Sequence, residues 1–453
     1  MDVLPTIIRD VTARKVFDSR GSITIEVEVY TESGYGSFIA PSGASKGKRE
    51  AIAFPSGGVD EAIRAVEELI APELLGVDSS DQFEVDNILR QVDGTPNFSK
   101  IGGSTAIATS IASAKAASAS LNLPLYKYLG GVFSHLLPLP LGNVIGGGKH
   151  SKGGGLDIQE ILVLPLKVDS FFEAARANSL VHKCIAQIAP PNTIYGRNDE
   201  GAWVTTFGIK ESLKLVKNAC NRISNEFGIK LGIGLDVAAS SLWSESEGKY
   251  VYPREGFKLT PEEHYRFIKK LIDDFSLIYI EDPFHEDDFN SFAQLLDEVS
   301  NCLVCGDDLY VTNAERIRYG ASLKASNAVI IKPNQIGTLT DTILAVDSAK
   351  ANGMIPIVSH RSGENTDPAI AHLAVGFGCP IIKTGVIGGE RISKINELIR
   401  IEEELGEKAG ERALRELTRG AKLLLEHFKD RIRGLREGLI GGFNAIRGGS
   451  LRR

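Results

Sequence analysis

The chain has 453 residues, of which 43% are hydrophobic and 24% charged, and its net charge is −7 at pH 7. This length and composition predict a globular protein of two domains, one of them large enough for a barrel of about 250 residues, and exclude a disordered or fibrous chain. The negative charge argues against nucleic acid as a general partner, and the lack of a leader pattern or a long apolar run predicts a cytoplasmic protein.

Residues 1–130 are predicted to form a small α+β domain. β-Branched and polar residues alternate over 22–30, and a second short run follows at 36–41 after the turn residues Glu32, Ser33 and Gly34, which predicts a β-hairpin. Helical periodicity then recurs in three segments, the last of them rich in alanine and serine and typical of a closely packed helix: 59–75, 81–92 and 104–121.

Residues 131–406 show a different pattern, in which short apolar runs alternate with amphipathic segments. Six of these runs end at polar residues: Asp236, Glu281, Asp307, Lys332, Ser359 with His360, and Lys383. The last five ends are 23 to 28 residues apart by subtraction of their positions, which fits one strand and one helix per interval. In a parallel barrel the carboxyl ends of the strands meet at one mouth, so these side chains are expected around one cavity.

The three acids among these strand ends, Asp236, Glu281 and Asp307, would repel one another without a cation. Ligands that offer only oxygen favour a hard metal, and Mg²⁺ typically keeps positions open for water and substrate. Cys302 and Cys305 lie three apart in a predicted strand and point to opposite faces, so we expect buried core thiols there.

The two lysines at strand ends, Lys332 and Lys383, would face this cation. A nearby cation lowers the pKa of an ammonium group, so such a lysine can act as a general base beside a metal-stabilised ene-diolate. Arg361 and Ser362 follow His360 and offer a forked cation and a hydroxyl suited to a phosphate. These residues together indicate a phosphorylated carboxylic acid as the substrate.

Several motifs, in their order along the chain, resemble those of the enolase family: DSRG (18–21), PSGASKG (41–47), DGTPNFSKIG (93–102), LPLYKYLGG (123–131), Gln159 with Glu160, IGLDVAASS (233–241), IEDPF (280–284), GDDLYVTN (306–313), KPNQIGT (332–338), SHRSGEN (359–365) and IKTG (382–385). The resemblance covers residues from about 8 to about 405. It implies an α/β fold, a (β/α)8-type barrel with an N-terminal α+β capping domain. It also implies the reversible, Mg²⁺-dependent dehydration of 2-phosphoglycerate to phosphoenolpyruvate, in glycolysis and gluconeogenesis.

The resemblance also implies roles for individual residues. Asp236, Glu281 and Asp307 would hold one Mg²⁺, and Ser45 would help to hold a second. Lys332 would remove the proton next to the substrate carboxylate, and Glu200, with Glu160 beside it, would assist loss of the hydroxyl from the other face. The residues expected around the substrate are His150, which lies in a Gly-rich lid, Gln159, Lys383, Arg361, Ser362 and His360. The family also implies a homo-oligomer.

Departures from the enolase pattern gather around the substrate. Gly146 stands where enolases usually carry Asn, Asn198 and Ala202 replace glycines, Pro333 follows the expected base, and VIGGER (386–391) lacks the usual Ala-Arg-Ser. These changes fit a true enolase, which we expect, or a paralogue that acts on another acid, or a catalytically silent binding or assembly protein. Mg²⁺ binding without turnover would favour the second, and loss of Mg²⁺ binding the third.

The last segment, residues 407–453, is a basic extension with twelve Lys and Arg against six Asp and Glu. Apolar residues recur in it at helical spacing, which predicts a stripe packed on the same protein or on a neighbouring subunit. Its arginines could contact nucleic acid, but no aromatic platform or recognition motif supports that reading.

Overall fold

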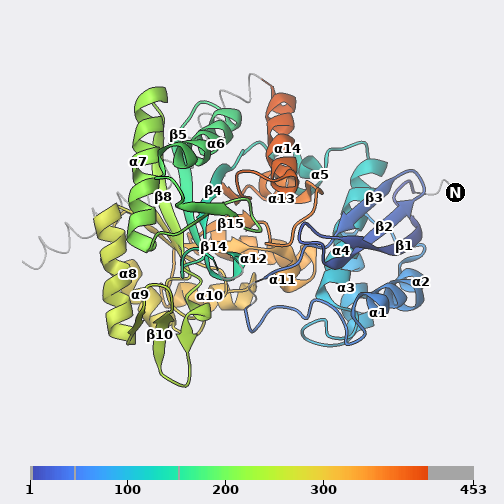
Figure 1. Cartoon of the computed structure of the whole chain (residues 1–453). Helices are drawn as coiled ribbons and strands as arrows, with labels where there is room; N and C mark the ends of the chain where they lie inside the picture. Colours follow the sequence, from blue (N-terminus) through green and yellow to red (C-terminus); the bar gives the residue numbers. More distant parts are fainter. Residues whose placement is uncertain (1–3, 45–46, 152–153, 407–453) are drawn as a thin grey trace, which may run out of the picture.

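The structure, a computed structural model, describes residues 4–44, 47–151 and 154–406. An N-terminal α+β part lies beside a closed barrel (Figure 1). The predicted second-metal ligand Ser45 and the basic extension 407–453 lie outside the described residues.

The N-terminal part contains the predicted hairpin and helices. Three antiparallel strands form one sheet, β1 (Ile8–Phe17), β2 (Ile23–Thr31) and β3 (Tyr35–Ile39). The helical elements are α1 (Gly58–Ala65), a π-helical turn (Val66–Ile70), α2 (Ala71–Leu74), α3 (Gln82–Asp93), α4 (Gly103–Ser120), α5 (Leu125–Gly130) and a 3₁₀ turn (Gly131–Phe133). The hairpin and the three predicted helical segments are therefore confirmed.

Helix α4 joins the two parts of the molecule. It packs on β2 and β3 and also contacts α11 (Pro333–Ile336) and α12 (Leu339–Ala351) of the barrel. The small side chains of α4 and Gly36 on β3 allow the helix and the strand to approach closely. A Cβ added at Gly36 would stand 2.1 Å from the carbonyl oxygen of Ala112 on the helix. The small side chains explain why nearly the whole helix is buried.

Eight strands close the barrel, in the order β16-β15-β14-β13-β12-β8-β5-β4 with a final pairing of β16 to β4. Their bounds are β4 (Leu139–Gly146), β5 (Glu160–Lys167), β8 (Lys230–Asp236), β12 (Tyr279–Glu281), β13 (Leu303–Gly306), β14 (Ala328–Ile331), β15 (Ile355–Ser359) and β16 (Ile381–Lys383). The predicted α/β barrel with an N-terminal α+β domain is confirmed.

Helices surround these strands (Figure 1). Besides α11 and α12 they are α6 (Phe171–Ile188), α7 (Ile209–Phe227), α8 (Pro261–Phe275), α9 (Phe289–Glu298), α10 (Ala314–Ser322), α13 (Ala369–Gly376) and α14 (Gly389–Leu405). Their starts follow local capping rules: Thr260 and Glu263 form a capping box at α8, with Pro261 in the first turn.

Short strands and 3₁₀ turns lie in the loops between the barrel elements. β6 (Ile194–Arg197) and β7 (Trp203–Thr205) form a hairpin beside β4, and β9 (Trp243–Ser244), β10 (Lys249–Tyr252) and β11 (Phe257–Leu259) form a small separate sheet. Two 3₁₀ turns, η3 (Gly148–Ser151) and η4 (Ala239–Ser241), follow β4 and β8.

Strand β5 runs against its two neighbours, β4 and β8. Its first residue, Glu160, is paired with Asp236, the last residue of β8. An antiparallel strand brings its start, not its end, to the mouth formed by the carboxyl ends of the others. This reversal places Glu160 at the mouth, although it begins a strand.

Alternate strand residues fill the barrel, because side chains along a strand point to opposite faces in turn. The interior cluster includes Leu141, Leu162, Tyr279, Cys305, Ala328, Ile330, Ile357 and Ile381. On four of these strands the next inward position toward the mouth holds a polar residue that belongs to the site. It is Asn143 after Leu141, Asp307 after Cys305, Lys332 after Ile330 and Lys383 after Ile381.

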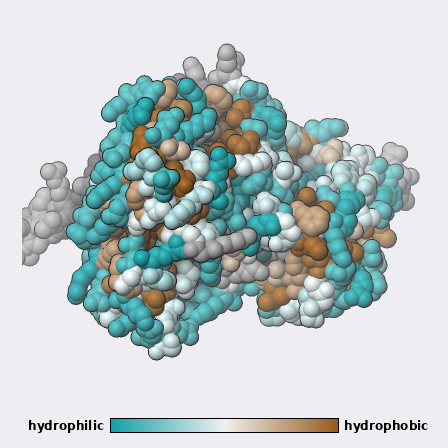
Figure 2. All heavy atoms as spheres, viewed as in Figure 1, coloured by the Kyte–Doolittle hydropathy of each residue, from teal (hydrophilic) through white to brown (hydrophobic). Residues whose placement is uncertain are grey.

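The visible face of the molecule is mainly hydrophilic, with hydrophobic residues in separate patches (Figure 2). Among the described residues, no helix has the length and apolar character needed to cross a membrane. All five cysteines are buried and free, as expected for core thiols.

Candidate active site

The closed strand order sets which residues face each other across the mouth. Strands β14 and β5 are separated by three strands in either direction around the ring. Lys332, directly after β14, and Glu160, at the start of β5, therefore stand on opposite sides. Strands β13, β12 and β8, between them on one side, carry Asp307, Glu281 and Asp236.

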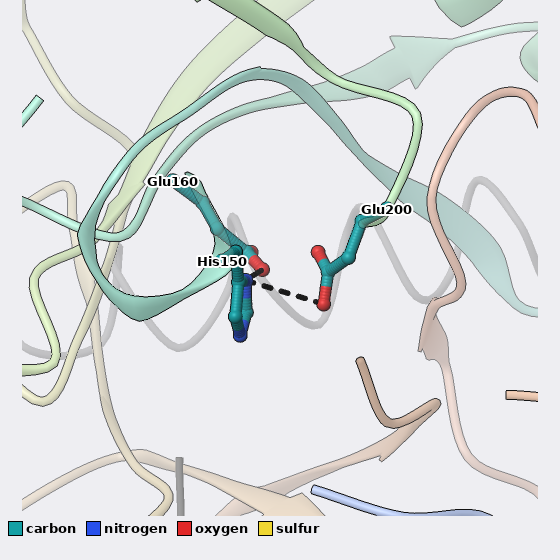
Figure 3. Close-up of side chains that lie close together, drawn as sticks. All are labelled: His150, Glu160 and Glu200. Atoms are coloured by element: carbon teal, nitrogen blue, oxygen red, sulfur yellow. Dashed lines mark ion pairs between the residues drawn. The ribbon is translucent and has the colours of Figure 1, made fainter. Parts of the chain in front are cut away.

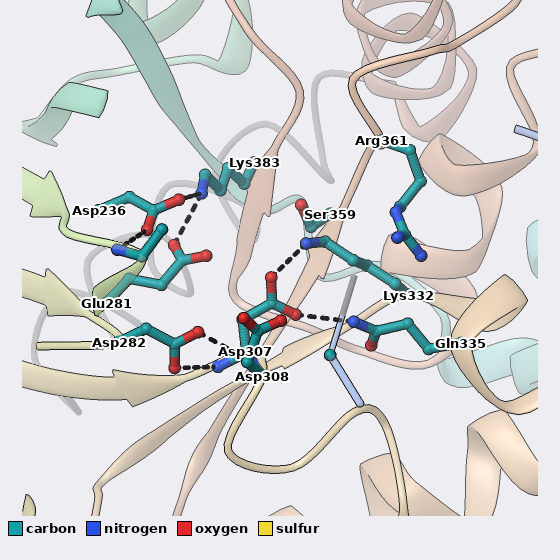
Figure 4. A network of polar contacts seen from close by, with 12 residues as sticks. Asp236, Glu281, Asp282, Asp307, Asp308, Lys332, Gln335, Ser359, Arg361 and Lys383 are labelled. Carbon is teal, nitrogen blue, oxygen red and sulfur yellow. Dashed lines mark hydrogen bonds and ion pairs between the residues drawn. The ribbon is translucent and has the colours of Figure 1, made fainter. Parts of the chain in front are cut away.

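Lys383 lies at the centre of one group of acids (Figure 4). Its Nζ is 2.9 Å from Asp236 Oδ2, 2.8 Å from Glu281 Oε2 and 2.9 Å from Glu160 Oε2. Burial lowers the pKa of Lys383, but the three carboxylates outweigh burial and hold it well above its usual range. Gln159 donates to Asp236 Oδ2 over 3.0 Å, so the predicted substrate residue Gln159 also borders this group.

Lys332 forms a second group with Asp307 (Figure 4). Its Nζ donates to Asp307 Oδ2, and the Gln335 amide donates to Asp307 Oδ1 over 2.9 Å. Burial lowers the pKa of Lys332, but the Asp307 carboxylate outweighs burial and raises it. Pro333 is accommodated because it begins α11, where a missing N–H costs nothing.

The loop that carries Asp307 is held by Asp282. The Asp282 carboxylate accepts hydrogen bonds from the backbone N–H of Asp307 at 2.9 Å and of Asp308 at 2.8 Å. Burial and the neighbouring Asp308 raise the pKa of Asp282 well above its usual range. Both oxygens of Asp282 are occupied by backbone donors, so Asp282 orients the loop that carries Asp307.

The acids of this mouth fit a hard divalent cation. Asp236, Glu281 and Asp307 are buried on three consecutive barrel strands. Glu281 Oε1 is buried and has no hydrogen-bond partner among the described residues. Burial and Asp236 raise the pKa of Glu281 to about 7. Buried carboxylates with an unused oxygen favour a cation with oxygen ligands.

Among the described residues, two groups have ligand atoms that all lie within 4.8 Å of one another, and the set Asp236, Glu281 and Asp307 is not one of them. The groups are Asp282 with Asp307 and Asp308, and His150 with Glu160 and Glu200. In the first group the Asp282 oxygens already accept backbone hydrogen bonds. The second group contains the two predicted catalytic acids and a histidine, and acid–base chemistry explains it without a metal. We therefore retain Asp236, Glu281 and Asp307 as the candidate ligands.

His150, Glu160 and Glu200 come together at the far side of the mouth (Figure 3). His150 Nδ1 lies 3.4 Å from Glu200 Oε1 and 3.6 Å from Glu160 Oε1. Burial and the neighbouring Glu200 raise the pKa of Glu160 well above its usual range. Burial also acts to raise the pKa of Glu200, but His150 and His360 outweigh it and hold that pKa low. The pair is arranged to keep one proton between its two carboxyl groups.

The predicted phosphate residues lie beside the N-terminal loop of residues 41–44. Ser362 Oγ accepts a hydrogen bond from Ala44 N over 2.6 Å, and Arg361 Nη1 donates to Glu50 Oε2 over 3.0 Å. A Cβ added at Gly43 would stand 1.9 Å from Arg361 Nη2, so the loop lies directly on the guanidinium group. His360 is also buried here, 3.7 Å from Glu200.

The structure brings the described candidate residues to one place. One cavity is lined by residues of both sides of the mouth: Gly43, His150, Gln159, Glu160, Glu200, Lys332, Ser359, His360, Arg361, Ser362 and Lys383. Asp236, Glu281 and Asp307 contact these lysines directly. Only Ser45, outside the described residues, is left without a position.

Sequence reasoning missed four supporting residues. Asn143 donates to Glu200 Oε2 over 2.9 Å, and Glu50 and Gln335 hold Arg361 and Asp307. Arg391 contacts His360. Asn143 is a buried amide inside an apolar strand run, which is a usable signal, whereas Glu50 lies in a segment with no local sign of a site. Arg391 ends the VIGGER segment, which stood out as a departure from the family pattern.

Comparisons with known proteins show which family this chain is similar to. The family "Enolase, N-terminal domain" matches residues 8–129, and "Enolase, C-terminal TIM barrel domain" matches residues 134–417. Curated enolases of Methanosphaera stadtmanae and Methanothermobacter thermautotrophicus are 51% and 49% identical to this chain over 406 residues. The enolase of Pyrobaculum aerophilum is 50% identical over 411 residues. Each alignment covers 89% of this chain and 98% of the relative.

Proposed function

The chain belongs to the enolase family and is a phosphopyruvate hydratase of glycolysis, and from that premise we propose which of its residues carry each part of the reaction. The reaction takes a proton from the carbon next to the substrate carboxylate and a hydroxyl from the neighbouring carbon. The main support for our assignment is that one cavity is lined by Lys332 and, from the opposite side of the barrel, by Glu160 and Glu200.

Lys332 is the proposed base. Its ammonium is buried at the mouth and, among the described residues, contacts one carboxylate, that of Asp307, whereas Lys383 contacts three. Fewer carboxylate contacts leave Lys332 easier to deprotonate, and a base must be neutral before it accepts a proton. Lys383 keeps its charge and is better suited to hold the substrate.

Glu200, with Glu160 beside it, is the proposed acid. Burial and Glu200 hold the pKa of Glu160 well above its usual range, which favours the protonated form of this carboxyl group. That proton can pass to the departing hydroxyl, which then leaves as water. His150, 3.4 Å from Glu200, is placed to assist the transfer.

Arg361 and Ser362 are the proposed phosphate residues, with His360 beside them. The guanidinium group offers paired donors that match a phosphate, and Ser362 adds a hydroxyl. Gln159 and Lys383 are proposed to surround the rest of the substrate. A substrate phosphate at Arg361 would also lie against residues 41–44, which rest on that side chain.

The family implies a divalent metal. We propose Mg²⁺, two ions for each site, with Asp236, Glu281 and Asp307 holding the first and Ser45 contributing to the second. A bound cation supplies positive charge beside the substrate carboxylate and offsets the Asp307 charge that raises the pKa of Lys332.

We also propose the domain limits, location and assembly of the chain. The limits are residues 1–130 for the capping domain, 131–406 for the barrel and 407–453 for the basic extension. The strand positions support the first limit, since β3 ends at Ile39 and β4 begins at Leu139. The proposed location is the cytoplasm, and the proposed homo-oligomer is implied by the resemblance set out above.

The test is the absorbance rise of phosphoenolpyruvate formed from 2-phosphoglycerate in the presence of Mg²⁺. We expect Lys332→Ala to lower kcat by roughly a hundredfold to ten-thousandfold, as is typical for loss of a general base, and a chelator to abolish turnover. Lys270→Ala, on the exposed face of α8, is the matched control and should keep wild-type kcat. Full activity of Lys332→Ala would contradict the proposed base.

A further inference from the structure

We propose that Asn198 is a positioning residue for Glu200, and that residue 146 must be glycine because the Asn198 amide occupies the space beside it. This inference deepens the proposed function, since it rests on Glu200 as the acid. It concerns two of the positions at which the sequence departs from other enolases.

The Asn198 side chain shapes the turn that presents Glu200. Its Oδ1 accepts hydrogen bonds from the backbone N–H of Glu200 and of Ala202, both at 3.0 Å. The backbone closes the same turn, because Asn198 N donates to Ala202 O over 2.9 Å. The Asn198 side chain therefore holds Glu200 N directly, and the backbone hydrogen bond to Ala202 O closes the turn between β6 and β7 around it.

The Glu200 carboxylate is held from its other end by Asn143. Asn143 Nδ2 donates to Glu200 Oε2 over 2.9 Å from the inner face of β4. With its backbone N–H and its carboxylate both bound, Glu200 has little freedom to turn away from Glu160. Loss of either contact should misplace the acid rather than weaken the binding of substrate.

Gly146 is the last residue of β4 and lies opposite Glu160 in the sheet register. A Cβ added there would stand 2.0 Å from Asn198 Nδ2 and 2.8 Å from Asn198 Cγ. Real Cβ atoms do not approach so closely, so any side chain at residue 146 must displace the Asn198 amide or the strand end. The amide nitrogen is itself buried and has no hydrogen-bond partner in the described ranges.

This contact links two departures that looked independent in the sequence. Other enolases usually carry Asn at position 146 and Gly at position 198, and this chain has the reverse. A side chain at both positions would overlap, so the two residues are coupled. In this chain the amide that binds the backbone of Glu200 comes from the turn between β6 and β7.

The first experiment removes the Asn198 amide. We expect Asn198→Ala to lower kcat by roughly tenfold to a hundredfold, as misplacement of a catalytic group does, with KM for 2-phosphoglycerate unchanged. Asp81→Ala is the matched control, since the Asp81 side chain also accepts a backbone N–H, that of Glu84, but caps α3 in the N-terminal part. It should lose stability and keep wild-type kcat. Wild-type kcat for folded Asn198→Ala would overturn the proposal.

The second experiment measures the coupling with a double-mutant cycle. Gly146→Ala should lower both kcat and the melting temperature in the wild-type background and neither in the Asn198→Gly background. Gly146→Asn combined with Asn198→Gly should recover most of the kcat that Asn198→Gly loses. Equal effects of Gly146→Ala in both backgrounds would overturn the proposal. If Asn198→Ala does not fold, this cycle alone decides.

The variant Glu200→Gln distinguishes a failure of the proposed acid from a failure of the positioning role of Asn198. If Glu200→Gln is inactive and Gly146→Ala has the same effect in both backgrounds of the cycle, the proposed acid stands and the positioning role of Asn198 fails. If Glu200→Gln is fully active, the proposed acid fails, and the role of Asn198 fails with it.

Discussion

Arg391 donates a hydrogen bond from Nη1 to Nδ1 of His360 over 2.8 Å. Nδ1 is therefore the acceptor in the neutral ring, and the proton lies on Nε2, the atom that faces Glu200. Arg391 is fully buried on α14 and also donates to Arg361 O at 2.5 Å and Ser362 O at 2.7 Å. One side chain thus holds the two proposed phosphate residues, Arg361 and Ser362, together with His360 beside them.

This arrangement predicts that Arg391→Lys weakens substrate binding. A lysine cannot reach three acceptors with the planar fork of an arginine, so the 360–362 segment should loosen. We expect KM for 2-phosphoglycerate to rise roughly tenfold, the equivalent of about 1.4 kcal/mol. Arg400→Lys, on the exposed side of the same helix, is the control and should leave KM unchanged. A wild-type KM for Arg391→Lys would show that the carbonyl contacts do not position the phosphate residues.

Glu281→Gln should abolish the effect of Mg²⁺ on the melting temperature of the protein. The Glu281 carboxylate is buried beside Asp236 with an unused oxygen, so removal of its charge should stabilise the metal-free protein. In wild-type protein, Mg²⁺ at a hundred times its Kd should add about 2.7 kcal/mol to the free energy of unfolding. We expect calorimetry to detect a Mg²⁺-induced rise in melting temperature for the wild type and none for Glu281→Gln. An equal rise in both proteins would exclude Glu281 as a ligand.

His264 predicts that the fold is sensitive to acid. Its Nε2 donates to Pro283 O over 2.7 Å, and its ring stacks on Tyr250 at 3.7 Å between centroids. Burial lowers the pKa of His264 to about 4. The unfolded chain takes up a proton at this histidine near pH 6.5, whereas the folded protein does not. The contribution of neutral His264 to the free energy of unfolding is therefore complete above pH 6.5 and is lost as the pH falls toward 4.

The full effect is up to about 3 kcal/mol for this one residue. Urea unfolding between pH 4.5 and 7 measures it. His264→Phe should be less stable at neutral pH, because Pro283 O loses its donor, and its stability should vary less with pH than that of the wild type. The same pH slope in both proteins would contradict the assignment.

Deletion of residues 407–453 should leave kcat unchanged, because every residue proposed for the reaction precedes Gly406. The stripe of apolar residues predicted in this extension points to packing on the same protein or on a second subunit. The number of subunits, obtained from the mass of the truncated protein in solution divided by the mass of its chain, separates these possibilities. Fewer subunits than in the full-length protein would assign the extension to assembly, and a loss of kcat would show that it reaches the active site.

Several site residues could be predicted because a local pattern carries them. Glu281, Lys332 and Lys383 each stand at the end of a short apolar run, and the two-residue period of a strand places each on the inner face above a buried side chain. The same two-residue period also places Asn143, an uncharged polar residue, on the inner face of its strand above Leu141.

Other residues reached the site through contacts that no local pattern records. Glu160 comes to the mouth because β5 runs against its neighbours, and the direction of a strand depends on the partners it pairs with. Glu50 meets Arg361 across 311 positions of sequence. The clash between a side chain at residue 146 and Asn198 exists only once β4 and the β6–β7 turn lie side by side.

The sequence by itself determined the class of fold, the strand ends that carry acids and lysines, and the resemblance that names the reaction, because strand period and motif order are local properties of the chain. Only the tertiary structure decided that Lys332 and Glu160 face each other across the barrel, that Lys383 contacts three acids, and that Asn198 stands where Gly146 leaves room. Those facts follow from closure of the ring and from strand direction, which are set by packing between segments far apart in the chain.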